Sequence, residues 1–585
     1  MRSTRSSPSS PAGVGDVTRG EPVRPGRMQP GGDPEMTADG SARAGDGALT
    51  ADGAAAPDPA LAPGGPGPVA IAAAGGVPLP TAAADERLYL LPRERLAHAV
   101  ADLAAGGWRF ATLVGTDERP AGGGFGVEVV MARARLPLVR MRADLPADAP
   151  GYPSVGHVLP AGLWDEREMH DLLGIAPVGH PDLRRLVLHD AFPDGYHPLR
   201  HDAPSVVPDG GAAVAYRPFV AHGEGVYELP VGPIHAGVIE PGHFRFSAMG
   251  ESVLYLDARL FFAHRGVEKL VEGRSAAAAL PIVERSCGVC TVAHATAFSL
   301  AVERIAGPAA EPPPRGQALR VVLAEMERLY NHIGDLGNMC AGIGFNVGSS
   351  GLGWLKEHAL RLNEGLTGHR YLMGIVAPGG LAFEPDAGAL GSLRARLDLL
   401  EADVAALLAI VDGSDAAQDR LRGAGRVTRQ AAQLLGAVGV GARASGIETD
   451  ARVDHPLGAY RGRSVTVATE DAGDARARFN IRTREVTETF RLLRELLADL
   501  PRGGSRVPVA ALPPGASALG WAEGPRGVSW LWLRIGPGGG VGRLRLRSAS
   551  YANWPSVAAA AADNLVPDFP LINKSFELCY ACTDR

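Results

Sequence analysis

The chain has few cysteines, no long apolar run and no recognisable export signal. Five of its 585 residues are cysteine, which favours a reducing compartment, where thiolates serve as ligands more often than as disulfides. No uninterrupted apolar run reaches the roughly 18 residues of a transmembrane helix. No apolar core follows the N-terminal arginines, as a signal peptide requires. We therefore expect a cytoplasmic protein whose contact with a membrane comes through partners.

Charge and missing motifs exclude further classes of ligand. The formal net charge is −6 at pH 7 and no polybasic tract is present, which argues against binding to nucleic acid. No Gly-x-Gly-x-x-Gly fingerprint follows a predicted strand, and there is no phosphate-binding loop. We therefore expect this chain to bind neither NAD nor ATP.

Length and composition predict four segments in an α+β protein. Residues 1–83 consist mainly of Ala, Gly, Pro, Ser and Asp, and such a segment buries too little apolar surface to offset its ordering entropy, so disorder is predicted. Residues 84–202 are expected to form a small α/β domain. Residues 203–226 are predicted to be a linker, and residues 227–585 one large, mainly helical domain.

Hydrophobic periodicity predicts the main elements of both domains. In the small domain, a helix over 94–105 is followed by three strands, over 109–114, 126–133 and 136–142. In the large domain, apolar residues recur every three or four positions and predict long helices, over 319–336, 390–411 and 486–500. These apolar stripes are expected to form the core of a helical bundle. A bundle of this kind places metal ligands from distant segments at one of its ends.

Four of the five cysteines form two Cys-x-x-Cys pairs, Cys287 with Cys290 and Cys579 with Cys582. Two such turns make a four-sulfur cage that suits zinc, iron–sulfur or a soft late transition metal. Zinc ribbons usually separate their pairs by roughly 15–20 residues, far less than the separation here, which favours a buried active-site metal. No additional cysteine set for an iron–sulfur cluster is present, and the isolated Cys340 is predicted to be a buried packing thiol.

Two groups of motifs resemble known families. Residues 164–175, WDEREMHDLLGI, and 179–186, GHPDLRRL, closely resemble the signature of the small peripheral-arm subunit of respiratory complex I. Residues 285–294, RSCGVCTVAH, and 579–585, CYACTDR, resemble the cysteine elements of nickel–iron hydrogenase large subunits. With its fused small domain, the chain is similar to the formate hydrogenlyase large subunit and its energy-converting relatives over about residues 85–585.

Further segments agree with this resemblance. Residues 232–244 and 264–269 are similar to elements shared by these hydrogenases and the quinone-site subunit of complex I. Residues 523–527, EGPRG, resemble the element that presents an arginine beside the hydrogenase metals, and residues 568–572 precede the last cysteine pair as they do in the family.

The resemblance implies a nickel–iron centre held by four thiolates, with Cys290 and Cys582 bridging nickel to an iron that carries small diatomic ligands. It implies that Arg526 polarises dihydrogen at the open metal position, since a guanidinium is a poor base. Glu240 is expected to be the first proton relay. The other residues expected to surround the centre or to carry protons are His235, His243, His264, Glu268, Arg285 and His294.

Glu268 stands where uptake-type hydrogenases have a magnesium ligand. The partner ligand in those enzymes is a terminal histidine, whereas Arg585 stands at that position here. A guanidinium can replace the charge of the cation by pairing with Glu268 or Asp584. No magnesium is therefore predicted.

The implied function is the reversible reduction of protons to dihydrogen by the catalytic subunit of a membrane-attached complex. The implied partners are a small iron–sulfur subunit of the complex I type, which supplies electrons, membrane subunits, and maturation proteins for nickel insertion. One alternative is a metal-free, complex I-like (NADH:quinone oxidoreductase) quinone-site subunit, which has no need of four thiolates. Another is a structural zinc scaffold, which leaves Arg526 and the setting of Arg285 and His294 unexplained.

Overall fold

The computed structural model describes residues 66–208, 215–235 and 239–585. All described residues belong to one compact unit, which spans Pro57–Arg585. Most of the segment predicted to be disordered, residues 1–65, lies outside the described residues. No helix in the described part of the chain is long and apolar enough to cross a membrane.

The small domain is built on a five-stranded sheet in the order β1-β2-β5-β4-β3, with β2 and β5 parallel and the other neighbours antiparallel. The strands are β1 (Val77–Leu79), β2 (Glu86–Leu90), β3 (Arg109–Asp117), β4 (Phe125–Ala132) and β5 (Leu138–Leu145). The helices are α1 (Pro66–Ala73), α2 (Leu96–Ala105) and α3 (Leu163–Leu173). The predicted helix and three strands are confirmed as α2, β3, β4 and β5.

Regular structure begins earlier than composition predicts. Within residues 66–83, α1 brings the fully buried Ile71 into the core of the small domain. Strand β1 pairs with β2, with Val77 opposite Leu90. The prediction of disorder is therefore wrong for residues 66–83, because a sheet edge and a core formed elsewhere in the chain accept their few apolar side chains.

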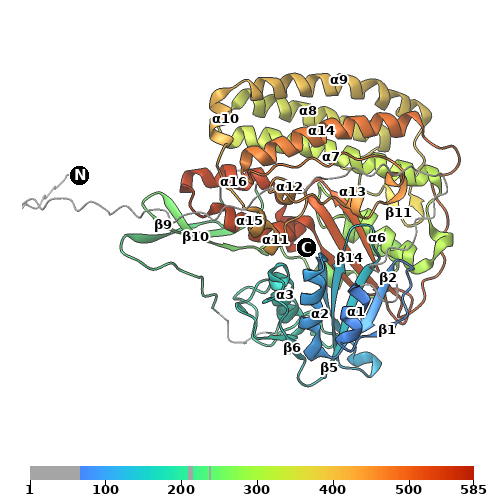
Figure 1. The fold of residues 1–585 in the computed structure, drawn as a ribbon. Helices are drawn as coiled ribbons and strands as arrows, with labels where there is room; N and C mark the ends of the chain where they lie inside the picture. Colours follow the sequence, from blue (N-terminus) through green and yellow to red (C-terminus); the bar gives the residue numbers. More distant parts are fainter. Residues whose placement is uncertain (1–65, 209–214, 236–238) are drawn as a thin grey trace, which may run out of the picture. The chain divides into compact units, whose positions relative to one another are not determined.

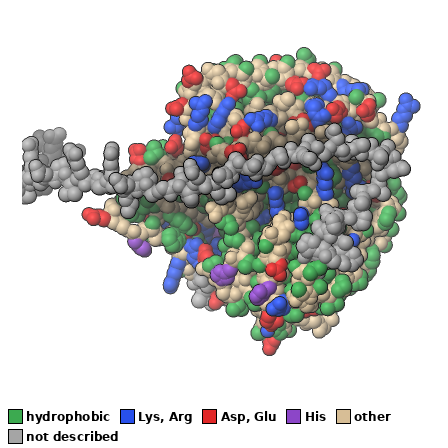
Figure 2. Space-filling model, viewed as in Figure 1, with side chains coloured by type: hydrophobic (Ala, Val, Ile, Leu, Met, Phe, Trp, Pro, Cys, Tyr) green, Lys and Arg blue, Asp and Glu red, His purple; other side chains and the backbone are tan. Residues whose placement is uncertain are grey.

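Four long helices of the large domain lie side by side in Figure 1. They are α7 (Pro314–Gly342), α8 (Asn346–Thr367), α9 (Ala387–Asp412) and α14 (Ala475–Ala498). The predicted helices are confirmed as parts of α7, α9 and α14. Helix α14 begins at Ala475, well before the prediction, because its first turns bury Arg478 and Arg482 and so interrupt the apolar pattern. On the face shown in Figure 2, acidic and basic side chains are interspersed over this helical layer.

The large domain also contains two three-stranded antiparallel sheets that periodicity did not predict. One has the order β10-β9-β8 and consists of β8 (Val226–Val231), β9 (His243–Met249) and β10 (Ser252–Arg259). The other has the order β13-β14-β15 and consists of β13 (Ser517–Gly524), β14 (Gly527–Ile535) and β15 (Val541–Arg547). The turn between β13 and β14 carries Arg526.

Shorter elements complete the described chain, and residues 203–208 and 215–225 contain no helix or strand. The remaining strands are β6 (Gly151–Pro153), β7 (Ala176–Val178), β11 (Val376–Ala377) and β12 (Gly380–Leu381). The remaining helices are α4 (Val267–Leu270), α5 (Ala276–Glu284), α6 (Thr291–Ala306), α10 (Asp415–Leu421), α11 (Arg429–Leu434), α12 (Gly439–Arg443), α13 (Ala451–Asp454), α15 (Ala549–Ala561), α16 (Phe569–Phe576) and α17 (Tyr580–Asp584).

The small and large domains share buried polar contacts. Arg140 of β5 pairs with Glu86 at 2.6 Å and with Glu128 at 2.7 Å, all three of them buried. The carboxylate of Glu128 also accepts a hydrogen bond from the indole of Trp532 on β14 (2.9 Å), and that of Glu86 accepts one from the backbone N–H of Leu519 on β13 (2.8 Å). The small domain is thus packed on the sheet that carries Arg526.

Candidate metal centre

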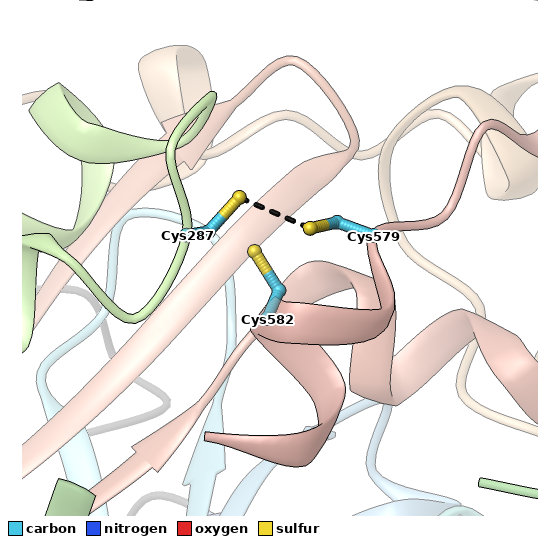
Figure 3. Close-up of side chains that lie close together, drawn as sticks. All are labelled: Cys287, Cys579 and Cys582. Atoms are coloured by element: carbon cyan, nitrogen blue, oxygen red, sulfur yellow. Dashed lines mark hydrogen bonds between the residues drawn. The ribbon is translucent and has the colours of Figure 1, made fainter. Parts of the chain in front are cut away.

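The two cysteine pairs converge from opposite ends of the large domain. Cys287 and Cys290 lie between α5 and α6, and Cys579 and Cys582 lie at the start of α17. The Sγ atoms of Cys287 and Cys579 are 3.1 Å apart, and those of Cys287, Cys579 and Cys582 all lie within 4.8 Å of one another (Figure 3). Cys290 packs with Cys287 and Cys582 in one buried cluster, to which Cys579 also contributes. All five cysteines of the chain are free thiols.

The first cysteine turn is held by helix α7. The Glu327 carboxylate accepts the backbone N–H groups of Val292 (2.7 Å) and Ala293 (3.0 Å), which would otherwise be unpaired in the first turn of α6. The Asn331 side-chain amide donates to the carbonyl of Val289 at 2.8 Å, as does the Tyr330 hydroxyl at 3.2 Å. The turn that carries Cys287 and Cys290 is therefore fixed on both sides.

The second cysteine turn is held by serine side chains at the start of α15 and by an aspartate at its own end. The backbone N–H of Cys579 donates to the Ser550 hydroxyl at 3.0 Å, and the Ser548 hydroxyl donates to the carbonyl of Cys582 at 2.8 Å. The Asp584 carboxylate accepts the backbone N–H groups of Phe261 (2.9 Å) and Ala263 (3.0 Å). The short helix α17 is thus anchored at both ends.

The chemistry of the four sulfur donors fits a soft metal cation. Hydrogen bonding with Cys287 and Cys582 lowers the pKa of Cys290 to about 6. Contact with Cys287, together with burial, raises the pKa of Cys579 to about 12, and burial raises the pKa of Cys582 well above its usual value. A cation that binds all four as thiolates supplies the positive charge that deprotonation of this cluster requires.

Arg526 is buried next to the sulfur cluster and is held by three acceptors. Its guanidinium donates to the carbonyl of Glu577 at 2.5 Å, to the side-chain oxygen of Asn331 at 2.6 Å, and to Asp335 at 3.1 Å. Burial opposes its charge, but Asp335 and Cys290 hold the pKa of Arg526 well above its usual value. The site therefore contains a fixed positive charge with directed N–H donors.

Glu240 is placed beside the second cysteine pair. Its Oε2 accepts the backbone N–H of Ala581 at 2.7 Å and lies 4.0 Å from Sγ of Cys579. Burial and the neighbouring Cys579 raise the pKa of Glu240. A carboxyl group that holds its proton more readily than an exposed glutamate therefore lies beside Cys579.

The predicted histidines lie at different distances from the sulfurs. His294 on α6 is fully buried with its Nε2 4.0 Å from Sγ of Cys582, and burial lowers its pKa to about 4, which keeps it neutral. The His264 Nδ1 hydrogen-bonds to the carbonyl of Asp584 at 2.6 Å. The ring of His235 lies 6.5 Å from that of Tyr580, and Nδ1 of His243 lies 3.0 Å from the carbonyl of Gly232. His235 is thus placed beside Tyr580, the residue that follows Cys579, and His243 is bound to the loop at Gly232.

Arg285 does not join the site. Its guanidinium donates to the carbonyl of Pro281 on its own helix (3.1 Å) and pairs with Glu284, and half of its side chain is exposed. Because the residue stands at the C-terminal end of α5, its side chain folds back along that helix. The proximity of Arg285 to Cys287 in sequence is therefore not a proximity of its guanidinium to the sulfurs.

Glu268 of α4 is buried among arginines. Arg543 approaches its carboxylate at 2.7 Å, and Arg545 and Arg585 each at 3.3 Å. The expected pairing of Arg585 with Glu268 is present. The guanidinium of Arg585 also makes two contacts with Glu168 of the small domain, which sequence analysis did not single out.

Two other residues missed by sequence analysis are Asn331 and Asp335, both partners of Arg526. With Glu327 they stand four residues apart on α7, so these three buried polar side chains share one face of the helix. Polar residues spaced four apart on a helix that is otherwise rich in apolar residues indicate, from the sequence alone, a buried polar site. Cys340, on the same helix, is buried as predicted.

Comparison with known proteins assigns a family to this arrangement. The family model described as nickel-dependent hydrogenase matches residues 265–336, which include the first cysteine pair. Formate hydrogenlyase subunit 5 of Escherichia coli (strain K12) is 36% identical, over 82% of this chain and 85% of its own length. The chain belongs to the nickel–iron hydrogenase large-subunit family. Hydrogenase-4 component G of the same organism is 34% identical, over 82% of this chain and 84% of its own.

This hydrogenase large subunit also contains complex I-like sequence. The family model for the 30 Kd subunit of respiratory-chain NADH dehydrogenase matches residues 90–207, and that for the 49 Kd subunit matches residues 354–514. The C/D subunit of NADH-quinone oxidoreductase from Gluconacetobacter diazotrophicus is 28% identical, over 76% of this chain and 81% of its own. The expected resemblance of the small domain is confirmed. The family implies a nickel–iron centre, and the names of the relatives imply partner subunits.

Proposed function

We propose that this chain is the catalytic subunit of a multisubunit nickel–iron hydrogenase that reversibly reduces protons to dihydrogen. The observation that carries the proposal is the convergence of Cys287, Cys579 and Cys582 within 4.8 Å, with Cys290 in contact and the buried guanidinium of Arg526 alongside. A structural zinc site needs the sulfurs but has no use for a fixed cation beside them.

The four cysteines would hold nickel, with Cys290 and Cys582 shared with an iron that carries diatomic ligands. When bound, this centre supplies the redox change and the place at which the bond of dihydrogen forms or breaks. Arg585 lies against Glu268 and takes the place of a magnesium ion. The chain itself would bind neither NAD nor an iron–sulfur cluster.

Arg526 and Glu240 carry out the chain's own part of the chemistry. Asn331 and Asp335 orient the guanidinium of Arg526 in advance. Its N–H donors therefore polarise a small substrate without a costly rearrangement of the site during the reaction. The carboxyl group of Glu240, whose Oε2 lies 4.0 Å from Sγ of Cys579, holds a proton and passes it outward towards His235 and His243.

A metal-free quinone-site subunit is the second candidate. The match of residues 354–514 to the 49 Kd family and the similarity to an NADH-quinone oxidoreductase favour it. The four converging thiols count against it, because a quinone pocket requires no cluster of sulfur donors.

We place the protein in the cytoplasm, on the inner face of the cell membrane, where partner subunits attach it. A small iron–sulfur subunit of the complex I type would deliver electrons near the cysteines, and maturation proteins would insert nickel. These partners follow from the family and from the absence of further cysteine ligands in the chain.

The test is elemental analysis of the complex purified anaerobically from its native host, together with infrared spectroscopy of the iron ligands and an assay of dihydrogen evolution. About one nickel per chain and loss of both nickel and activity in Cys582→Ser are expected. Cys340→Ser is the matched control, since this buried thiol lies outside the sulfur cluster. Zinc without nickel, or full activity in Cys582→Ser, would overturn the proposal.

A further inference from the structure

A buried cluster of charges lies between the small domain and α17. We call it the interdomain charge cluster, and it consists of Glu168, Glu268, Arg543, Arg545 and Arg585. All five side chains are buried. Glu168 belongs to α3 of the small domain, and the other four belong to the large domain. The cluster therefore joins a carboxylate of one domain to the segment of the other that carries Cys579 and Cys582.

Glu168 makes the closest polar contacts to Arg585 in this cluster. Nη2 of Arg585 lies 2.8 Å and 2.7 Å from the two carboxylate oxygens of Glu168, compared with 3.3 Å between Nη1 and Glu268. Glu168 also accepts from Arg545 at 2.6 Å. Removal of this carboxylate would leave the guanidinium of Arg585 buried with a single, longer ionic contact, which is unfavourable for a buried charge.

Arg585 is coupled to the cysteines through the backbone of α17. It follows Cys582 by three residues, and its N–H donates to the carbonyl of Ala581 at 3.1 Å. Its own carbonyl accepts the backbone N–H of Arg265 at 2.7 Å. The side chain of Arg265 in turn donates to the carbonyls of Ser286 (2.7 Å) and Ala581 (3.1 Å), and so spans both cysteine turns.

A displacement of Arg585 therefore reaches both halves of the sulfur cluster. Metal thiolate sites tolerate errors of only a few tenths of an ångström in ligand position. Residues that orient ligands from outside the ligand set are known to change metal affinity by about 10–100-fold.

We propose that Glu168 is a positioning residue of the metal centre: the small domain holds Arg585 through this carboxylate, and so fixes Cys579 and Cys582 in their metal-binding arrangement. The inference rests on the proposed function for its consequence in nickel binding, but its structural part concerns the metal-free chain as well. On this proposal the small domain contributes to the metal site itself and does more than pack against β13 and β14.

The test compares Glu168→Gln with Glu166→Gln. Glu166 is equally buried on the same helix, but its partners, Tyr152, Ser154 and Val155, all belong to the small domain. Amide hydrogen exchange of the full chain purified without nickel is measured first. Exchange across residues 577–585 is expected to rise about tenfold in Glu168→Gln and to stay at the wild-type rate in Glu166→Gln.

The second measurement is the rate at which a chelator removes nickel from the matured complex, followed with the infrared bands of the iron ligands. Glu168→Gln is expected to lose nickel about 10-fold faster, with shifted bands, and Arg585→Met is expected to match it. The double variant is expected to be no worse than either single variant, because both act on one contact. Arg585→Met also serves if Glu168→Gln does not fold.

Wild-type exchange at residues 577–585 in Glu168→Gln, or an increase shared by Glu166→Gln, would overturn the inference. A failure of the proposed function looks different. In that case the wild-type complex contains no nickel, while the exchange difference between the two variants is still measured in the metal-free chain.

Discussion

Replacing Arg526 by lysine keeps the positive charge of the site and removes its directed donors. The guanidinium bridges the carbonyl of Glu577 and the side chains of Asn331 and Asp335 at 2.5–3.1 Å. A lysine ammonium is a single donor centre on an unbranched chain and does not reproduce that fork. The substitution therefore separates the effect of charge from that of geometry.

The expected loss follows from what one preorganised donor contributes. Removal of such a donor costs about 10²–10³ in rate, or about 2.7–4 kcal/mol. Asp335 keeps Arg482 at 3.3 Å after the change, so the carboxylate that orients Arg526 is not left without a cation. None of the four sulfur ligands loses a hydrogen bond in this substitution. We therefore expect turnover to fall about 100- to 1000-fold with the nickel content unchanged.

The assay is dihydrogen evolution driven by an artificial electron donor, combined with nickel analysis of the same sample. Arg285→Lys is the matched control, because Arg285 adjoins the cysteine pair in sequence while its guanidinium contacts Glu284 and Pro281 instead. The control is expected to keep wild-type turnover. If nickel falls together with activity in Arg526→Lys, the arginine is structural and the reasoning is refuted.

Three further predictions concern the proton path, the N-terminus and acid stability. Glu240→Gln keeps a side-chain oxygen that can accept the N–H of Ala581 but removes the titrating carboxyl group. Turnover should therefore fall about 100-fold or more at constant nickel content. The control Glu251→Gln, at an exposed position, should leave both turnover and nickel content unchanged. Deleting residues 1–65 should leave the melting temperature and activity unchanged, whereas deleting residues 1–83 removes the buried Ile71 and strand β1 and should lower the melting temperature by several degrees. Despite burial, arginines lower the pKa of Glu268 from 4.5 to about 2. This shift corresponds to about 3 kcal/mol of stability of the metal-free chain. The contribution is complete above pH 4.5 and is lost as the pH falls towards 2. Acid titration of Glu268→Gln followed by circular dichroism should lack this component, and a profile parallel to wild type would contradict the assignment.

The sulfur cluster and Arg526 could be singled out from the sequence because each lies in a short local motif. Cys287 and Cys290 share one turn, Cys579 and Cys582 share another, and a metal cage is the simplest reason for both. Long helices such as α7 and α9 were predicted for a similar reason, since their apolar spacing is local and is repeated over many turns. The boundaries of α14 were missed where buried arginines replace apolar residues.

What remained hidden depends on pairing between distant segments. The strands β13–β15 are buried on both faces and so lack the alternation that reveals a strand, whereas β8 contains no buried residue. Asn331 and Asp335 acquire their roles only when the turn between β13 and β14 brings Arg526 to α7. The side chain of Arg285 shows the opposite error, because nearness in sequence to Cys287 does not determine where its guanidinium points.

The interdomain charge cluster gives a physical reason for the two domains to occur in one chain. Glu168 and Asp165 of α3 face Arg545, Arg547 and Arg585 in a region without exposed polar surface. Buried charges of this kind are costly when a partner is absent. The large domain alone would leave Arg547 without its carboxylate partner and Arg545 and Arg585 with only Glu268, at 3.3 Å from each. A small domain supplied on the same chain is present at high effective concentration and supplies the missing carboxylates whenever α17 folds. We therefore expect the segment that carries Cys579 and Cys582 to lose order when the small domain is absent, which would couple assembly of the protein to formation of the proposed metal site.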